Sequence, residues 1–198
     1  MSSTTIAPTS FEKPRSLPYK GQVGMLCLIV AESSIFTIFV VAYIYYIGKS
    51  LSGPTPREVL EIPIFATVCL LSSSLSIHAA VSALRKTQLA AFRLWWLVTL
   101  VLGGIFLTAT GREWHHLIYH KGLTISTNLF GTTYYSLVGL HAFHVSVGLV
   151  GLAIVLILAL RKLVRQEHFR NVETFAMYWH FVDAVWVVVF TVVYIVGR

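Results

Sequence analysis

Ionisable side chains inside long apolar segments are the residues of this sequence best suited to chemistry. Two carboxyl groups and four imidazoles lie in such segments: Glu32, His78, His141, His144, His180 and Asp183. His141 and His144 are three residues apart, as are His180 and Asp183, so each pair shares one face of a helix. A charged side chain at the centre of a bilayer costs about 2.5–3.5 kcal/mol on insertion scales, so these groups are expected to face protein or water.

Three interpretations suit these residues. The histidines could bind heme or a metal ion, but axial heme ligands come from facing helices, and no cysteine or acidic cluster completes a metal set. Glu32 and Asp183 could form the core of a proton relay or transporter, although the sequence lacks the repeat symmetry typical of transporters. Interhelical hydrogen bonds, with contacts to lipid head groups, form the third interpretation, and the spacing favours it.

The elements that position these residues are transmembrane helices. Of the 198 residues, 56% are hydrophobic and only 12% are charged, and the mean hydropathy is +0.75, which is typical of a polytopic membrane protein. A spanning helix needs about 20 mostly apolar residues. The predicted fold is therefore all-α, a single membrane domain over residues 21–198, with five transmembrane helices at about 21–47, 62–84, 94–111, 129–160 and 175–197.

Basic residues predict the orientation of these helices. Ten Lys and Arg residues would lie on the side of the N-terminus and five on the other, so the N-terminus is expected in the cytoplasm and the C-terminus outside. The net charge of +7 reflects this arrangement and does not indicate nucleic-acid binding. Residues 1–20 show no signal-peptide pattern and are expected to form a disordered or extended cytoplasmic tail. The linker 48–58, with two prolines and two glycines, predicts an ordered outer turn.

Small residues in the predicted spans indicate close helix packing, because apolar helices in lipid associate through close contact and polar groups. The candidates are Ser72, Ser76 and Ala80 in the second span, Gly103 and Gly104 in the third, and Gly148 and Gly151 in the fourth. The two cysteines both fall inside predicted spans and give neither a disulfide framework nor a zinc spacing.

Several motifs, in chain order, resemble those of subunit III of the heme–copper respiratory oxidases. Residues 173–186, ETFAMYWHFVDAVW, are similar to the family signature E…YWHFVDxVW, and residues 130–148, FGTTYYSLVGLHAFHVSVG, to FG(S/T)xFFxLTGxHGxHVxxG. GREWHHLI and AESSIF…GPTPRE agree with further family motifs, so the resemblance covers about residue 18 to the end. Five spans rather than seven make the chain similar to the shorter bacterial form, and Ala31 and Ala142 are small-for-small departures.

The resemblance implies a non-redox subunit of a proton-pumping cytochrome c oxidase, which reduces oxygen to water, in the bacterial plasma membrane. Such a subunit supports assembly, lipid binding, proton uptake and stable turnover of the catalytic subunit I. No catalytic residue, heme or metal site is expected in this chain, since heme a and copper belong to partner subunits. The expected partners are subunit I as the main contact, subunit II, other oxidase subunits, phospholipids and a respiratory supercomplex, with no nucleic acid.

Two alternatives to this function stay open. One is subunit III of a quinol oxidase, although glutamate rather than aspartate at position 32 is more similar to the cytochrome c branch. The other comes from a different class: a free-standing heme b membrane protein or a small proton-coupled transporter. A heme protein would show its own absorption band, and a transporter would show flux from this chain alone. A subunit III would show neither and would co-purify with heme-bearing partners.

The resemblance also implies roles for single residues. Glu32 matches the family's membrane-embedded glutamate, which reacts with hydrophobic carbodiimides, and is expected to be a buried, protonated and proton-active carboxyl. The expected interhelical polar network comprises His78, Glu113, His141, His144, Glu173, His180, Asp183 and Trp186. Arg85, Arg161 and Trp179 are candidates for contact with lipid head groups, since the arginine fork suits phosphate and tryptophan suits the interface.

Overall fold

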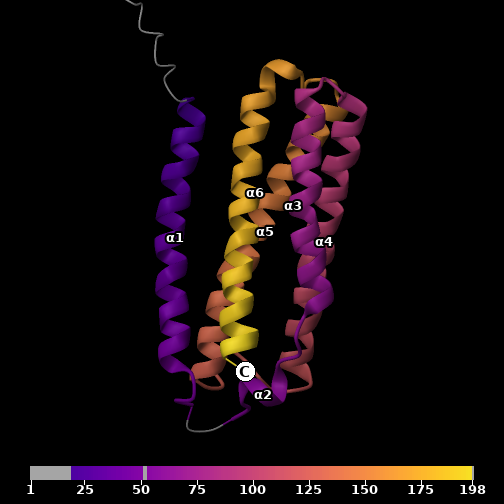
Figure 1. The fold of residues 1–198 in the computed structure, drawn as a ribbon. Coiled ribbons are helices and arrows are strands. Elements are labelled where there is room, and N and C mark those ends of the chain that lie inside the picture. Colours follow the sequence, from indigo (N-terminus) through magenta and orange to yellow (C-terminus); the bar gives the residue numbers. More distant parts are fainter. Residues whose placement is uncertain (1–18, 51–52, 198) are drawn as a thin grey trace, which may run out of the picture.

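The structure, a computed structural model, describes residues 19–50 and 53–197 as a bundle of long helices (Figure 1). No strand occurs in these residues. Most of the expected N-terminal tail lies outside them. The elements are α1 (Lys20–Tyr46), α2 (Pro56–Val59), α3 (Ile64–Arg85), α4 (Leu89–Tyr119), α5 (Leu129–Leu160), the 3-10 turn η1 (Gln166–His168), α6 (Phe169–Phe190) and the π-helical turn η2 (Thr191–Val196).

Five helices in the described part of the chain are long and apolar enough to cross a membrane: α1, α3, α4, α5, and α6 with its flanking turns. This confirms the predicted all-α membrane fold. Even the shortest, α3 with 22 residues, is about 33 Å long at 1.5 Å per residue, which exceeds the roughly 30 Å hydrocarbon layer. Helix α4 extends beyond the expected range 94–111, from Leu89 to Tyr119, because polar residues end an apolar run without ending a helix.

The helices form an antiparallel bundle with α1 at one edge. Figure 1 shows α1 beside α5 and α6, whereas α3 and α4 pair with each other at the opposite edge. Helix α6 contacts α1, α3 and α5, and α5 contacts α1, α4 and α6, so these two helices form the centre of the bundle. Helix α1 begins at the end of the bundle where α6 also begins, and α6 ends at the other. We call the first the basic end, because Lys20, Arg85, Arg161 and Arg170 lie there.

The centre of the bundle is built around Trp179 of α6, whose side chain is fully buried. A Cβ added at Gly103 of α4 or at Gly148 of α5 would lie 2.8 Å from its indole ring. The ring thus fits between two helices because both present glycine. Small residues also bring α3 and α4 together, since Ser76 Oγ lies 2.7 Å from Thr99 Oγ1. Gly104, by contrast, faces open space.

The segment between α1 and α3 is held against the start of α5. Asn128 caps α5, accepting a hydrogen bond from the Gly131 N–H at 2.8 Å, and its amide donates to the Pro54 carbonyl at 3.3 Å. The Phe130 N–H donates to Ser50 Oγ at 3.1 Å. The expected outer turn at 48–58 therefore contains the helical turn α2 and ordered contacts in its described part, while residues 51 and 52 lie outside the described residues.

Candidate functional site

Glu32 of α1 pairs with His144 of α5 inside the membrane-spanning part of the bundle. The distance from Glu32 Oε2 to His144 Nε2 is 3.1 Å. Phe36 and Tyr43 continue the same face of α1 and are buried, so their packing turns Glu32 toward α5. The Phe36 ring centroid lies 5.0 Å from that of His144. The imidazole is 9% exposed and the carboxyl 23% exposed, so α1 shields most of the pair from the surroundings.

The hydrogen bonds of His144 fix where its proton lies. Nδ1 is 2.8 Å from the Leu140 carbonyl oxygen. Because a carbonyl can only accept, Nδ1 carries hydrogen. The contact between Nε2 and Glu32 then needs one further proton, either on the carboxyl as an O–H donor or on Nε2 of an imidazolium. In both forms the pair has no net charge. The geometry therefore suits a carboxyl that shares one proton with an imidazole.

Asp183 of α6 lies in a second polar cluster, where α6 meets α3. Its side chain is buried, at 3% exposure, and Oδ2 accepts a hydrogen bond from the Ser74 hydroxyl. The same hydroxyl lies 3.1 Å from His180 Nδ1, so Ser74 bridges the carboxyl and the imidazole. Next to it, the Trp179 indole donates to Ser73 Oγ at 2.8 Å. Asp183 Oδ1 has no hydrogen-bond partner among the described residues.

Glu113 forms a third cluster toward the end of the bundle opposite the basic end. Its Oε1 accepts hydrogen bonds from Tyr194 at 2.8 Å and from Tyr134 at 3.3 Å. These three residues belong to α4, η2 and α5, so one carboxyl ties three elements together. Tyr194 lies on the π-helical turn η2. Wide turns of this kind re-aim side chains and are frequent at functional sites.

Glu173 makes polar contacts at the basic end. Its carboxyl accepts from the Gln22 amide at 3.3 Å and pairs with Arg85 at 3.4 Å. Trp186, deeper along α6, donates to Thr67 of α3 at 3.2 Å. Together with the Ser73 and Ser74 bonds, these contacts form a ladder of polar interactions along α3 and α6. The ladder fixes the register of α6 against α3.

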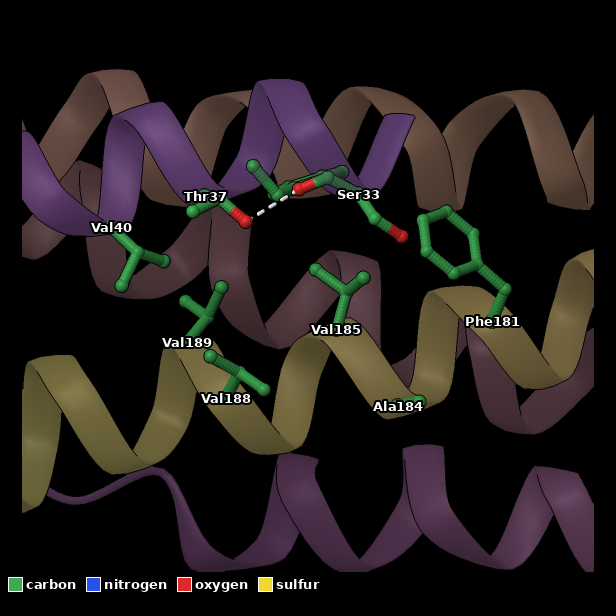
Figure 2. A pocket seen from close by; sticks show the side chains of 9 residues that line it. Ser33, Thr37, Val40, Phe181, Ala184, Val185, Val188 and Val189 are labelled. Atoms are coloured by element: carbon green, nitrogen blue, oxygen red, sulfur yellow. Dashed lines mark hydrogen bonds between the residues drawn. The ribbon is translucent and has the colours of Figure 1, made fainter. Parts of the chain in front are cut away.

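An apolar groove lies between α1 and α6 (Figure 2). Its volume is about 310 Å³. The hydroxyls of Ser33 and Thr37 both donate to backbone carbonyls of α1, each at 2.7 Å, so they present no free donor to the groove. Valine and phenylalanine side chains form most of the remaining wall: Phe36, Val40, Phe181, Val185, Val188 and Val189. An acyl chain fits this lining better than a polar molecule.

Comparison with known proteins identifies the family of the chain. The model of the family described as cytochrome c oxidase subunit III matches residues 19–198. The chain belongs to this family. It is 35% identical to a cytochrome c oxidase subunit 3 of Synechocystis over 98% of this chain and 83% of that protein. A cytochrome c oxidase subunit 3 of Alkalihalophilus pseudofirmus is 33% identical over 88% and 86%.

The chain is therefore a subunit III of a heme–copper terminal oxidase, as its motifs predicted. The oxidase is an oxidoreductase complex, and other oxidase subunits are its partners. A quinol oxidase subunit 3 of Bacillus subtilis is also similar, at 28% identity over 88% of this chain and 86% of that protein. The five apolar helices of the present chain make it a multi-pass membrane protein. Among its described residues, no group of three or more His, Cys, Asp and Glu is placed to hold a metal ion.

Two residues expected in the polar network of this subunit III make no hydrogen bond in its described part. His141 is fully buried, and neither ring nitrogen has a partner. Its ring stacks on Trp186 with centroids 5.0 Å apart and meets the edge of Phe106 at 5.8 Å, so its contacts are aromatic. His78 is exposed on α3. The prediction was wrong for His141, because spacing gives the face of a helix but not its neighbour. For His78 the polar role stays a prediction.

The prediction of a lipid head-group contact was wrong for Trp179. Its ring is enclosed between Gly103 and Gly148 and is fully buried, so no head group can reach it. A tryptophan near a helix end resembles an interfacial residue in sequence, but the two glycines that receive it lie on other helices. Arg85 and Arg161 are exposed at the basic end, and for them the head-group role stays a prediction.

The sequence reasoning missed the hydroxyl partners of the acids. Ser74 binds Asp183, while Tyr134 and Tyr194 bind Glu113. In an apolar span a serine indicates close helix packing, and a tyrosine counts toward hydropathy as a hydrophobic residue, so neither marks a partner of a carboxyl. A useful signal would have been that each buried carboxyl needs donors, and that hydroxyls are the commonest donors in these spans.

Proposed function

We propose that this subunit supports the assembly, lipid binding, proton uptake and turnover stability of the catalytic subunit I of a proton-pumping cytochrome c oxidase. In this proposal the chain itself holds no redox centre, and heme a and copper lie in partner subunits. The relatives named cytochrome c oxidase subunit 3 support cytochrome c as the electron donor. Subunits I and II are the proposed neighbours.

The proposed role in proton uptake rests on the contact between Glu32 and His144. A carboxyl and an imidazole that share one proton, with no net charge, can keep an acid in the membrane without an unpaired charge. Glu32 lies on α1, at one edge of the bundle, and His144 lies on the neighbouring α5. Glu32 is thus the proposed proton-active carboxyl, and His144 is the residue that positions it.

The lipid-related part rests on the groove between α1 and α6 and on the arginines of the basic end. The groove is apolar, and on α6 its wall runs from Phe181 to Val189, so an acyl chain can lie along it. Arg85 and Arg161 are exposed at the basic end, where a phosphate would meet them. The excess of Lys and Arg on this side supports a cytoplasmic location for it in the bacterial plasma membrane.

The first test is a subunit inventory of an affinity-tagged preparation of this chain, solubilised in mild detergent. The expected result is co-purification with a large subunit that carries heme a and copper, and turnover with reduced cytochrome c. Turnover with quinol but not with cytochrome c would overturn the proposed donor. A chain that purifies alone with its own heme band would overturn the proposed function.

The second test is labelling of the purified oxidase with a hydrophobic carbodiimide, which reacts with protonated carboxyls. Glu32→Gln is expected to abolish labelling of this subunit without loss of assembly, because the glutamine amide can still donate to His144 Nε2. Glu173→Gln is the matched control, since Glu173 lies at the basic end beside Arg85, and labelling should persist in it. Labelling that survives in Glu32→Gln would show that another carboxyl is the protonated one.

A further inference from the structure

The surface where α3 meets α6 exposes an imidazole deep in the membrane-spanning region. His78 is exposed and lies seven residues before Arg85, the last residue of α3. At 1.5 Å per residue this places it about 10 Å inside the helix end. We call the surface around it the His78 face. It comprises Leu71, Leu75 and His78 of α3 with His180 and Ala184 of α6, and Leu75 is 76% exposed.

A hydrogen-bonded array runs from the interior to the His78 face. The Ser74 hydroxyl has a single hydrogen, which it donates to the Asp183 carboxylate. The oxygen of Ser74 must then accept from His180 Nδ1, 3.1 Å away, so in the neutral imidazole the other ring nitrogen, Nε2, carries a lone pair. Nε2 has no partner in the described residues and is not enclosed by them. Ser74 and His180 therefore connect the buried Asp183 carboxylate to an acceptor, His180 Nε2, that is open to the surroundings of the chain.

Lipid is a poor neighbour for this surface. Hydrocarbon offers neither a donor nor an acceptor, so polar groups at membrane depth face protein or water. The outward faces of two other helices are apolar, as a surface in contact with lipid requires. On α4 it presents Leu94, Leu97 and Val101, and on α5 Val147, Val150 and Ile154, all exposed and all apolar. The His78 face differs from both because two imidazoles interrupt it.

We propose that the His78 face is a docking surface for a transmembrane helix of another oxidase subunit, which presents a hydroxyl or carboxamide side chain to His78 and His180. Such a side chain both donates and accepts, so it satisfies the acceptor on His180 and either nitrogen of His78. Leu71 and Leu75 supply the apolar contact on the side away from the basic end. A lipid head group fits less well, because the imidazoles lie about 10 Å below the helix end.

This inference rests on the proposed place of the chain in an assembled oxidase. The test uses a photo-crosslinking amino acid at Leu75 in the full complex, activated in native membranes before purification. Val150 is the matched control, because Leu75 and Val150 are both exposed and each lies ten residues before the end of its helix at the basic end. We expect Leu75 to crosslink to another oxidase subunit several times more than Val150 does.

Three outcomes would overturn the proposal. Crosslinking of Leu75 to lipid alone, to a second copy of this chain, or to other subunits no more than Val150 would each contradict coverage of this face by a helix of another oxidase subunit. A preparation in which the chain brings down no other oxidase subunit would instead contradict the proposed function. The two failures are therefore distinguishable in one experiment.

Two substitutions at His78 give an independent test with opposite signs. If a partner helix covers the face, His78→Gln should keep the subunit in the complex during a detergent wash, whereas His78→Leu should lose it severalfold faster. If lipid covers the face, His78→Leu removes a polar group from hydrocarbon and should retain the subunit as well as wild type or better. Retention of His78→Leu equal to or better than that of wild type would therefore contradict the proposal.

Discussion

Helices α1 and α6 each carry one membrane-embedded carboxyl, but the bundle holds them in different ways. In the most apolar 18-residue stretch of each segment, 6% of the α1 residues are buried, against 50% in the α6 segment. Helix α6 has Trp179 between two glycines and a ladder of polar contacts to α3. In the described residues α1 has the pair of Glu32 with His144 inside the bundle and, in its first turn at the basic end, the hydrogen bond from Gln22 to Glu173.

The difference shows that packing and polar contacts contribute in different proportions to the attachment of different helices in one bundle. Apolar helices gain little in lipid from covering apolar surface, so association depends on close packing and hydrogen bonds. Helix α6 has both. Helix α1 has little packing, so its polar pair carries a larger part of its attachment. Changes in packing should therefore affect α6 most, and the loss of a single polar pair should matter more for α1 than for α6.

The largest effect is expected for Trp179→Ala. Removing the ring leaves a cavity between Gly103 and Gly148, and truncation of a buried tryptophan to alanine costs about 3–5 kcal/mol. The free energy of unfolding, measured by titration from mild detergent into SDS, should fall by that amount. Trp95→Ala is the control, because Trp95 is 42% exposed. Similar losses in the two variants would show that Trp179 does not organise the centre of the bundle.

A smaller effect is expected for Asp183→Ala, which removes one contact of the α3–α6 ladder. An interhelical hydrogen bond in a membrane protein contributes about 1 kcal/mol, and the other contacts of the ladder remain. Retention of the subunit during a detergent wash should decrease slightly. Asp183→Asn should behave like wild type, since the amide oxygen still accepts from Ser74. A greater loss of retention for Asp183→Ala than for Trp179→Ala in the same detergent wash would reverse the order of packing and polar contacts on α6.

The same contrast explains what the sequence could and could not predict. Hydropathy and length predicted five spans, and these follow from local composition alone. The partners of Glu32 and Asp183 depend on which faces of distant helices meet. His144 was named in the polar network without Glu32 as its partner, and Ser74 was missed altogether. Long-range pairing of this kind is set by tertiary packing, which spacing along one helix does not report.

Trp179 and His141 show the same limit from the other side. Both sit in recognisable motifs, and their residue types suggested an interface and a hydrogen-bond network. Their actual neighbours are glycines and aromatic rings from other helices. A residue's chemistry thus limits the roles it can take, and the neighbouring helices select one of them.

A third prediction sharpens the description of α1. In a double-mutant cycle with Glu32→Leu and His144→Leu, the coupling energy should be about 0.6 kcal/mol, the average for such bonds in a membrane protein. The free energy of unfolding in SDS is again the measurement. Each single variant leaves one polar group unpaired, so only the cycle isolates the pair. A coupling energy near zero would mean that apolar contacts of Phe36 and Tyr43 attach α1 on their own.

The smallest effect is expected for Arg85→Gln at the basic end. Arg85 pairs with Glu173 at 3.4 Å, but its side chain is 69% exposed, and exposed ion pairs contribute about 0–1 kcal/mol. The free energy of unfolding should change by less than about 0.5 kcal/mol, with any difference vanishing at high salt. Lys86→Gln is the control, because Lys86 is exposed and has no ion pair in the described residues. A cost for Arg85→Gln above the Glu32–His144 coupling, and above Lys86→Gln, would mean that the helix ends, and not the membrane-embedded pair, set the strength of polar attachment in this bundle.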